Sequence, residues 1–274
     1  MFASVGISHH MCDIIKSMFY GITIINLILL CIAMFAAGFV DSIAGGGGCI
    51  SLPAYLLVGL PTHTAFACNK TSACIGTSVA TYKYLRSGNI NVKVTLISAV
   101  CGVIGSNIAA RIIFALDAVL FQKIIICVTP FAALFLILKK DFGSEDAFDT
   151  IPTGKVWIVS IITGLILGLY DGIVGPGTGT FAIMIFASVL KFDLKTAGGN
   201  SKLLNFCTGL GSAIHYVMIG AVIWPLVALT AGSNILGNYI GSNLAIKKGA
   251  PFIRVMMSVA VLILLAKLAY DVFA

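Results

Sequence analysis

Long apolar segments separated by short polar linkers dominate this chain of 274 residues. Hydrophobic residues make up 59% of it, only 10% of the residues are charged, and the mean hydropathy is +1.07. Such values lie outside the range of soluble domains, and an apolar helix of about twenty residues is long enough to cross a bilayer. The sequence therefore predicts an all-α, polytopic transmembrane protein. Its ten apolar segments are 18–40, 49–60, 64–85, 92–115, 119–138, 155–174, 179–190, 196–219, 222–246 and 252–273.

A glycine-rich motif occurs twice within apolar sequence. Residues 38–48 read GFVDSIAGGGG, and residues 168–180 read GLYDGIVGPGTGT. Glycine breaks helices, and each motif is followed by a segment of only about twelve apolar residues, too short to cross a bilayer alone. A helix broken at membrane depth is tolerated where its free backbone groups meet protein, water or a polar solute. We therefore expect broken or short helices directly after both motifs.

The two motifs belong to a repeat that covers most of the chain. At an offset of about 130 residues Asp41 aligns with Asp171, Lys70 aligns with Lys202, and the matching residues keep their order. Each repeat has five apolar segments, and because five is an odd number the two repeats should be inverted relative to each other. The expected organisation is an N-terminal segment 1–17, a first repeat 18–138, a central polar loop 139–154 and a second repeat 155–274.

Positive charges change sides between equivalent loops of the two repeats. Arg86 and Lys93 flank a loop whose equivalent near Gly220 is uncharged. Conversely, the uncharged loop at Pro61 corresponds to a loop with Lys191. Inverted repeats with a positive cytoplasmic face produce this pattern. If every segment crosses, both termini lie on the non-cytoplasmic side. The net charge of +7 then comes from positive residues at segment ends, which orient the protein in the lipid bilayer. We therefore expect no nucleic-acid partner.

Backbone amide groups at the glycine breaks are the first candidates for a solute site. Free N–H groups at a helix start attract anions, and transporters built from inverted repeats bind solute at broken helices. The candidate residues are Gly45, Gly46, Gly47, Gly48, Gly175 and Gly177. The alternative is that these glycines only let helices pack closely. Neither motif ends in Gly-Lys-Ser or Gly-Lys-Thr, which argues against a nucleotide-binding P-loop.

Two lysines inside apolar segments are the second candidates. An ionisable group such as Lys70 or Lys202 is costly at membrane depth and usually faces a cavity or a partner. An ammonium group beside amides and hydroxyls can hold a small oxyanion. The accompanying polar residues are Asn69, Thr178, Ser201 and Asn205. Two alternatives stay open: the lysines snorkel to the interface, or the polar side chains only form interhelical hydrogen bonds.

Asp41 and Asp171 lie at equivalent positions before the glycine runs. They are candidates for partners of the lysines, for helix-terminal caps or for carriers of a coupling proton, and we favour pairing or capping over contact with solute. Two carboxylates at membrane depth also raise the alternative of an intramembrane aspartyl protease, in which a carboxylate dyad activates water. The second motif lacks the Gly-x-Gly-Asp pattern of such enzymes, which argues against that activity.

The cysteines and histidines give no sign of a metal site. The chain has eight cysteines and four histidines, without ligand spacing, and most cysteines lie within apolar segments. Such cysteines behave as small buried apolar residues. We therefore expect no metal and no cofactor, and we do not expect an enzyme.

The residues of both motifs resemble those of the sulfite exporter TauE/SafE family. The resemblance is carried by 37–48, 50–53, 59–61 and Asn69-Lys70 in the first half, and by 168–172, 175–179, Lys202 and Asn205 in the second. It implies a multi-pass carrier of a bacterial inner membrane that is secondary and ion-coupled, with sulfite or other sulfur-containing or organic anions as solutes.

Together, these features favour a secondary transporter or exporter of small anions that works by alternating access between two inverted repeats. A proton is a candidate coupling ion. A passive anion channel is the remaining alternative, since a sequence does not distinguish a pore from a carrier. The exact solute, the direction of flux and the choice between monomer and homodimer are left open.

Overall fold

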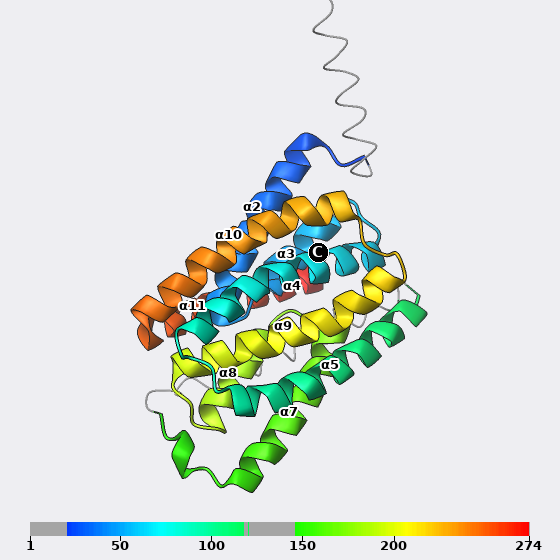
Figure 1. The fold of residues 1–274 in the computed structure, drawn as a ribbon. Coiled ribbons are helices and arrows are strands. Elements are labelled where there is room, and N and C mark those ends of the chain that lie inside the picture. The colour runs from blue at the N-terminus through cyan, green and yellow to red at the C-terminus, as the bar shows by residue number, and fades with distance from the viewer. Residues whose placement is uncertain (1–20, 118–119, 121–145, 274) are drawn as a thin grey trace, which may run out of the picture.

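The computed structural model describes residues 21–117, 120 and 146–273 (Figure 1). Within these residues all regular structure is helical and no strand occurs, which confirms the all-α prediction. The expected N-terminal segment 1–17, nearly all of the expected segment 119–138 and the central loop before residue 146 lie outside the described residues. The elements are α2 (Ile24–Ala44), α3 (Gly48–Leu57), α4 (Thr62–Arg86), α5 (Val92–Ala115), η1 (Phe148–Thr150), α7 (Thr153–Ile173), α8 (Thr178–Ser188), α9 (Leu194–Met218), α10 (Trp224–Lys248) and α11 (Ala250–Phe273).

Three of the described helices, α2, α5 and α7, are both long enough and apolar enough to cross a membrane. Their outer surfaces carry large exposed apolar side chains, such as Ile28 and Ile32 on α2 and Ile104 on α5. Helices α4, α9 and α10 have 25 residues each, but they are more polar, and many of their polar side chains are buried inside the bundle. Apolar residues outside and polar residues inside fit a polytopic membrane protein.

The short helices α3 and α8 begin at the ends of the glycine-rich motifs, at Gly48 and Thr178, within one residue of the predicted starts. They have 10 and 11 residues. Gly45 ends α2 in a left-handed conformation with φ 79°, and Gly177 precedes α8 with φ 85°. Glycine adopts these angles without the steric cost that a Cβ brings. The chain therefore breaks at the same place in both halves.

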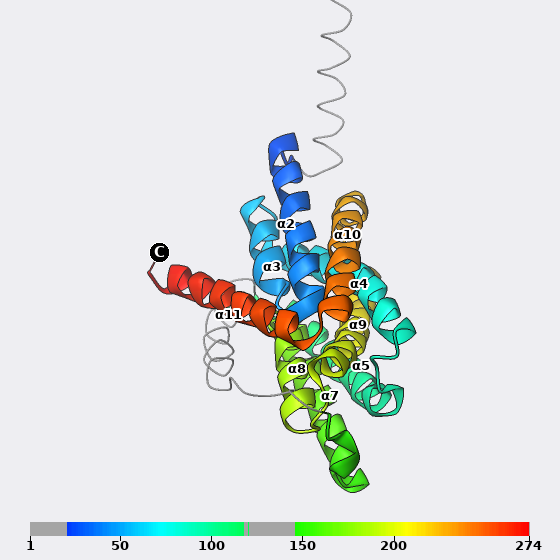
Figure 2. The same ribbon diagram turned by 90° about the vertical axis from the view of Figure 1, so that its left-hand side faces the viewer.

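The central helices α4 and α9 pack against each other in opposite directions. Thr81 donates a hydrogen bond from its hydroxyl to the carbonyl of Lys202 at 3.0 Å, whereas the Cys74 thiol, earlier in α4, lies 3.7 Å from the carbonyl of Phe206, later in α9. Residues later in α4 contact residues earlier in α9, so the two helices are antiparallel. Figure 1 shows both helices between α10 and α5, and Figure 2 shows them next to each other.

The outer helices exchange partners between the two halves of the chain. Helix α10 packs along α2, and helix α5 packs along α7. Glycines make both contacts close, since a Cβ on Gly237 would overlap the backbone of Phe35, and one on Gly168 would overlap the backbone of Gly102. Small residues at such interfaces allow the close approach that holds membrane helices together. Helices from the first half of the chain are thus packed directly against helices from the second half.

Positive charge gathers at one end of the bundle. The amide of Asn91, after α4, donates to the side chain of Asn200 near the start of α9. The amide of Ala147 donates to the carbonyl of Lys191, and Gly249 lies against the side chain of Lys195. The basic residues on these helix ends and loops are Lys83, Arg86, Lys93, Lys155, Lys191, Lys195, Lys247, Lys248 and Arg254. The opposite end has Arg111, near the end of α5, but its loops 58–61, 116–117 and 219–223 contain no lysine or arginine.

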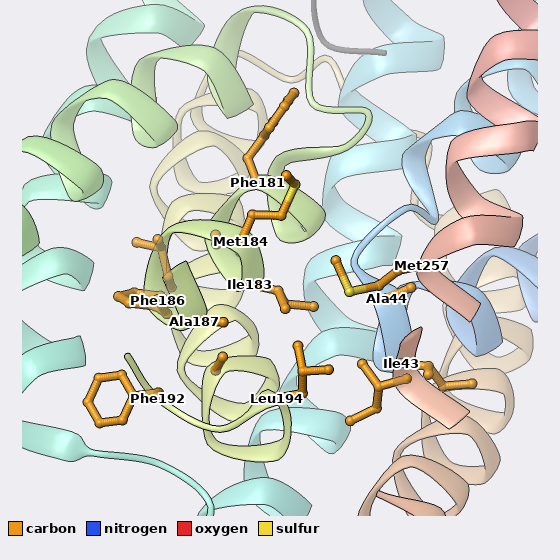
Figure 3. Close-up of a cluster of buried hydrophobic side chains, with 14 of the residues drawn as sticks. Ile43, Ala44, Phe181, Ile183, Met184, Phe186, Ala187, Phe192, Leu194 and Met257 are labelled. Atoms are coloured by element: carbon orange, nitrogen blue, oxygen red, sulfur yellow. The ribbon is translucent and has the colours of Figure 1, made fainter. Parts of the chain in front are cut away.

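Two apolar clusters fill the two ends of the bundle. In the first, the end of α2 with Ile43 packs against Ile183 of α8, Leu194 of α9 and Met257 of α11 (Figure 3). The second surrounds Tyr55 of α3 with residues from α2, α4, α5 and the ends of α9 and α10. Along α4, the residues that belong to these clusters flank five buried polar residues, Asn69, Lys70, Thr71, Ser72 and Thr77. Polar groups are thus concentrated at mid-length of the central helices.

Candidate functional site

The two helix interruptions touch each other in the centre of the protein. A Cβ on Gly45 would overlap the backbone of Gly179, so the two chain segments are in direct contact. The hydroxyl of Thr180 donates to the carbonyl of Ala44, the last residue of α2, at 2.7 Å. This bond satisfies one of the carbonyl groups that a helix leaves free at its C-terminus. The break in one half is therefore held by the break in the other.

Helices α3 and α8 both start at this meeting point. The first amide groups of a helix have no acceptor inside the helix, and they attract negative charge. The amide of Gly47 is directed to the Asp41 carboxylate at 3.4 Å. Gly48, the first residue of α3, and Gly179, in the first turn of α8, border the same cavity. Two helix starts, one from each half, therefore face one internal space.

This cavity has a volume of about 70 Å³, measured as the space open to the centres of water-sized molecules. One water needs roughly 10–15 Å³ on this measure, so the cavity holds several waters or a small solute. Its lining residues are Ala37, Asp41, Gly45, Gly47, Gly48, Ser51, Asn69, Lys70, Ala73, Cys74, Thr77, Asp171, Gly175, Pro176, Gly179, Asn205, Gly209 and Asn234. The predicted candidates among them are Gly45, Gly47, Gly48, Asn69, Lys70, Gly175 and Asn205, together with Asp41 and Asp171.

Lys70 lies at the cavity and forms an ion pair with the other half of the chain. Its Nζ is 2.7 Å from Oδ1 of Asp171, and the two side chains are 8% and 10% exposed. The same carboxylate oxygen accepts a hydrogen bond from the Thr178 hydroxyl at 3.1 Å. Lys70 also packs against Gly175, where a Cβ would be 2.8 Å from Nζ. The ammonium group thus lies between α4 and the glycine-rich turn before α8.

Lys202 forms the second ion pair, again with the opposite half. Its Nζ is 2.9 Å from Oδ2 of Asp41, and its side chain is completely buried. The same ammonium donates to the main-chain carbonyl of Asp41. The alternative that Lys202 snorkels to the interface is therefore wrong. Because Asp41 lies in the last turn of α2, this lysine holds the broken end of that helix in place.

Five predicted candidates lie outside the cavity lining: Gly46, Gly177, Thr178, Ser201 and Lys202. Ser201 donates to the carbonyl of Gly179 at 2.8 Å. The Thr178 hydroxyl lies 2.7 Å from the carbonyl of Gly175 and shares its single proton between this carbonyl and the Asp171 carboxylate. A Cβ on Gly46 would press against the side chain of Ala260 in α11. These residues shape the turns that border the cavity, and they do not themselves form its wall.

Several polar residues that line the cavity were not predicted from the sequence. Ser51, Thr77 and Asn234 all line it. The amide of Asn234 donates to the carbonyl of Met34 at 3.0 Å and thereby ties α10 to α2. The signal available in the sequence was an amide in the middle of an apolar segment, which is costly unless it has a partner. Hydroxyls such as Ser51 and Thr77 give no such signal, because they also occur at ordinary helix contacts.

The described residues offer little for metal or protease chemistry. They contain no group of three or more histidine, cysteine, aspartate or glutamate side chains that could hold a metal. Each of the two membrane aspartates binds a lysine from the other half. A proteolytic dyad requires the two carboxylates to share a proton with each other. The pairing with lysine therefore disfavours that alternative.

A family model described as sulfite exporter TauE/SafE matches residues 30–268. The chain belongs to this family. It is 32% identical over 245 residues to "Probable membrane transporter protein ORF9" of Sinorhizobium sp, covering 89% of this chain and 93% of that protein. A "Probable membrane transporter protein" of Haemophilus influenzae is 30% identical over 244 residues, covering 89% and 94%. "Probable membrane transporter protein YfcA" of Escherichia coli K12 is 31% identical over 247 residues, covering 89% of each chain. No solved structure matches the chain.

Membership of the TauE/SafE family agrees with the apolar surface of the described helices. Both observations make the chain a multi-pass membrane protein of a family of transporters, not of enzymes. The glycine-rich motifs on which the resemblance rests are the residues at the two helix breaks. Residues of the two motifs that carry the resemblance therefore also border the cavity.

Proposed function

We propose that this TauE/SafE protein is a secondary transporter or exporter of small anions in a bacterial inner membrane. Sulfite and other sulfur-containing or organic anions are the candidate solutes. The observation that carries the proposal is the internal cavity, where the Lys70 ammonium meets the starts of two helices. A buried cation beside the N-terminal ends of two helices favours negative charge.

Lys70 and the first turns of α3 and α8 supply the binding groups in this proposal. Charge-assisted hydrogen bonds from an ammonium group are stronger than neutral ones. Asp171 lies 2.7 Å from this ammonium group. An incoming anion competes with this carboxylate, which gives the solute a direct effect on the contact between the halves. Asp171, once displaced, is the group that a coupling proton would neutralise.

The inverted repeat supplies the mechanism. Its support is that α4 and α9, which are equivalent in the two repeats, run in opposite directions, and that each lysine pairs with the aspartate of the other half. Transporters of this design bind solute at the interface of the repeats and expose it alternately to the two sides. We assign the basic end of the bundle to the cytoplasm, which leaves both termini outside.

The experiment that tests this function is a flux screen. The purified protein is reconstituted in liposomes, and the uptake of sulfite, sulfate, thiosulfate and small sulfonates is measured with and without a pH gradient. We expect saturable uptake of at least one of these anions above that of protein-free liposomes. Uptake of none of them would contradict the proposal.

Counterflow separates a carrier from a channel. A carrier preloaded with unlabelled anion accumulates labelled anion transiently, because the site must return occupied. A passive channel only equilibrates the label. We expect the transient accumulation, and its absence alongside a flux that does not saturate would assign the protein to the channels.

A further inference from the structure

We infer that Tyr55, together with Ser72 and Thr230, forms the gate that closes the internal cavity toward the outer end of the bundle. The outer end is the one with loops 58–61 and 219–223, which we assign to the non-cytoplasmic side. This inference rests on the alternating access proposed above, which requires one closure on each side of the solute.

The Tyr55 hydroxyl joins three helices by buried hydrogen bonds. It donates to Oγ1 of Thr230 in α10 at 2.6 Å, and it lies 3.0 Å from the hydroxyl of Ser72 in α4. All three side chains are fully buried. Tyr55 itself belongs to α3, the short helix that begins at the first glycine break. One side chain therefore connects this short helix to a long helix from each half of the chain.

The bond between Tyr55 and Thr230 lies beside the cavity, on its outer side. Ser51 lines the cavity, and Tyr55 follows it by one turn of α3 as this helix runs toward loop 58–61. Asn234 also lines the cavity, and Thr230 precedes it by one turn of α10, which starts after loop 219–223. A turn of helix is about 5.4 Å long. The bond therefore joins α3 and α10 within about one turn of the cavity wall.

The partners of Tyr55 also have acceptors within their own helices. Ser72 donates to the carbonyl of Asn69 at 3.1 Å, and Thr230 donates to the carbonyl of Leu226 at 2.8 Å. These bonds persist when α3 and α10 separate. Water that enters at the opening pairs the freed Tyr55 hydroxyl at little cost. The contact can thus break and form again in each cycle, as a gate requires.

The inverted repeat has apolar residues at the equivalent positions. The three equivalents are Ile185 in α8, Leu204 in α9 and Val94 in α5, and the aligned Gly-Ser-Asn residues 105–107 and 241–243 set the offset for the last of them. Val94 and Leu204 belong to the first apolar cluster, at the basic end, and Ile185 packs against it. Hydrogen bonds require a defined geometry, whereas apolar contacts do not. A latch that depends on hydroxyl groups is thus present on the outer side of the cavity and replaced by apolar packing at the basic end.

The thiol of Cys74 provides a reporter for this gate, because it lines the cavity and is free and buried. A membrane-impermeant methanethiosulfonate is added to intact bacterial cells that make the full chain, or to inside-out membrane vesicles. Mass spectrometry measures the rate at which Cys74 is modified. Tyr55→Phe removes the hydroxyl and keeps the ring, so the rate in intact cells should rise about three- to tenfold. The rate in inside-out vesicles should not rise.

Tyr84→Phe is the matched control. The Tyr84 hydroxyl is also fully buried, and it donates to the carbonyl of Ser42 at 3.2 Å at the basic end. This variant should not raise the rate in intact cells. Thr230→Val removes the acceptor of the Tyr55 bond from α10, and it should raise the rate in intact cells as Tyr55→Phe does.

The labelling requires no solute, so its outcome is separate from that of the flux screen. Rates in intact cells that rise neither in Tyr55→Phe nor in Thr230→Val, alongside saturable anion uptake by the unaltered protein, would overturn this inference alone. An equal rise in Tyr84→Phe would also overturn it, because the loss of any buried hydroxyl would then loosen the protein. Absence of anion uptake would overturn the proposed function.

Discussion

The two ion pairs of this protein occupy equivalent places in the sequence, yet their surroundings differ. Lys70 borders the cavity, and both it and its partner Asp171 keep a small exposed area. Lys202 is fully buried, lies outside the cavity wall and binds both the carboxylate and the main-chain carbonyl of Asp41. Lys70 thus has space beside it for a solute, whereas the ammonium group of Lys202 is occupied by two oxygen atoms of Asp41 at the end of α2.

From this difference we expect the two copies of the motif to have different roles. We expect the pair at the cavity to serve recognition, because its ammonium can exchange a carboxylate for a solute anion. We expect the buried pair to serve stability, because it holds the end of a broken helix. The following predictions either separate the two roles or show that they are the same.

The largest expected effect is on stability and comes from Lys202→Met. Removing one partner of a buried ion pair leaves the other charge uncompensated and costs about 3–5 kcal/mol in the free energy of unfolding. Lys70→Met should cost less, since the freed Asp171 carboxylate faces a cavity large enough for water. Thermal unfolding of the purified variants in detergent measures the difference.

A double variant provides the control for that result. Asp41→Asn combined with Lys202→Met removes both charges, so part of the lost stability should return. If Lys70→Met lowers the unfolding temperature as much as Lys202→Met, the two pairs have the same structural role and the comparison fails.

The second largest effect separates the two glycine turns. Gly45 and Gly175 are equivalent, and their φ angles are 79° and 86°. Alanine costs about 1–2 kcal/mol in such a left-handed conformation. At Gly45 the added Cβ also overlaps the Gly179 backbone, which costs about 1–3 kcal/mol more, whereas at Gly175 it meets only the movable end of Lys70. We expect Gly45→Ala to be the more destabilising in thermal unfolding. A larger loss for Gly175→Ala would contradict the contact between the breaks.

For transport we expect the opposite order from that for stability, with the larger effect in Lys70→Met. Lys70→Met removes the charged donor, which is worth about 1.5–3 kcal/mol, so the apparent affinity for anion should fall about ten- to hundredfold. Lys155→Met, at an exposed position at the start of α7, is the control and should transport normally. The measurement is concentration-dependent uptake in liposomes with equal amounts of folded protein. Unchanged affinity in Lys70→Met would remove this lysine from the site.

The smallest expected effect concerns the hydroxyls that support the two aspartates. Thr178 donates to Asp171 at 3.1 Å, and Thr77 is directed to Asp41 at 3.5 Å. A hydrogen bond of this kind contributes about 0.5–1.5 kcal/mol. Thr178→Val should therefore change the apparent affinity for anion several-fold, because Asp171 competes with the solute for Lys70. Thr77→Val should change it less. The reverse order would indicate that Asp41, and not Asp171, is coupled to the solute.

Much of the helical framework was predictable, because apolar length and glycine breaks are local signals. The short helices α3 and α8 begin where the motifs end, and α5 has the bounds 92–115 expected from the sequence. The expected segment 119–138 lies outside the described residues. Helices α4, α9 and α10 are less apolar than α2, α5 and α7, because their buried faces carry polar residues.

The site was predictable in its components but not in its pairing. Lys70, Asn69 and the glycines were identifiable, since charge, amides and helix breaks are unusual in apolar sequence. That Lys70 meets Asp171 and Lys202 meets Asp41 depends on how one half packs into the other, which no local pattern encodes. For the same reason the sequence did not reveal that Lys202 lies behind the wall of the cavity.

The central claim is that the cavity between the two helix breaks binds the anion. Selenite is a close chemical relative of sulfite, and its selenium atom can be located by anomalous X-ray scattering. A crystal structure of the protein soaked in selenite tests the claim most directly. We predict selenium in the cavity, with a selenite oxygen within hydrogen-bonding distance of Lys70 Nζ. Selenium bound elsewhere, with the Lys70–Asp171 pair intact and the cavity holding only water, would contradict the account.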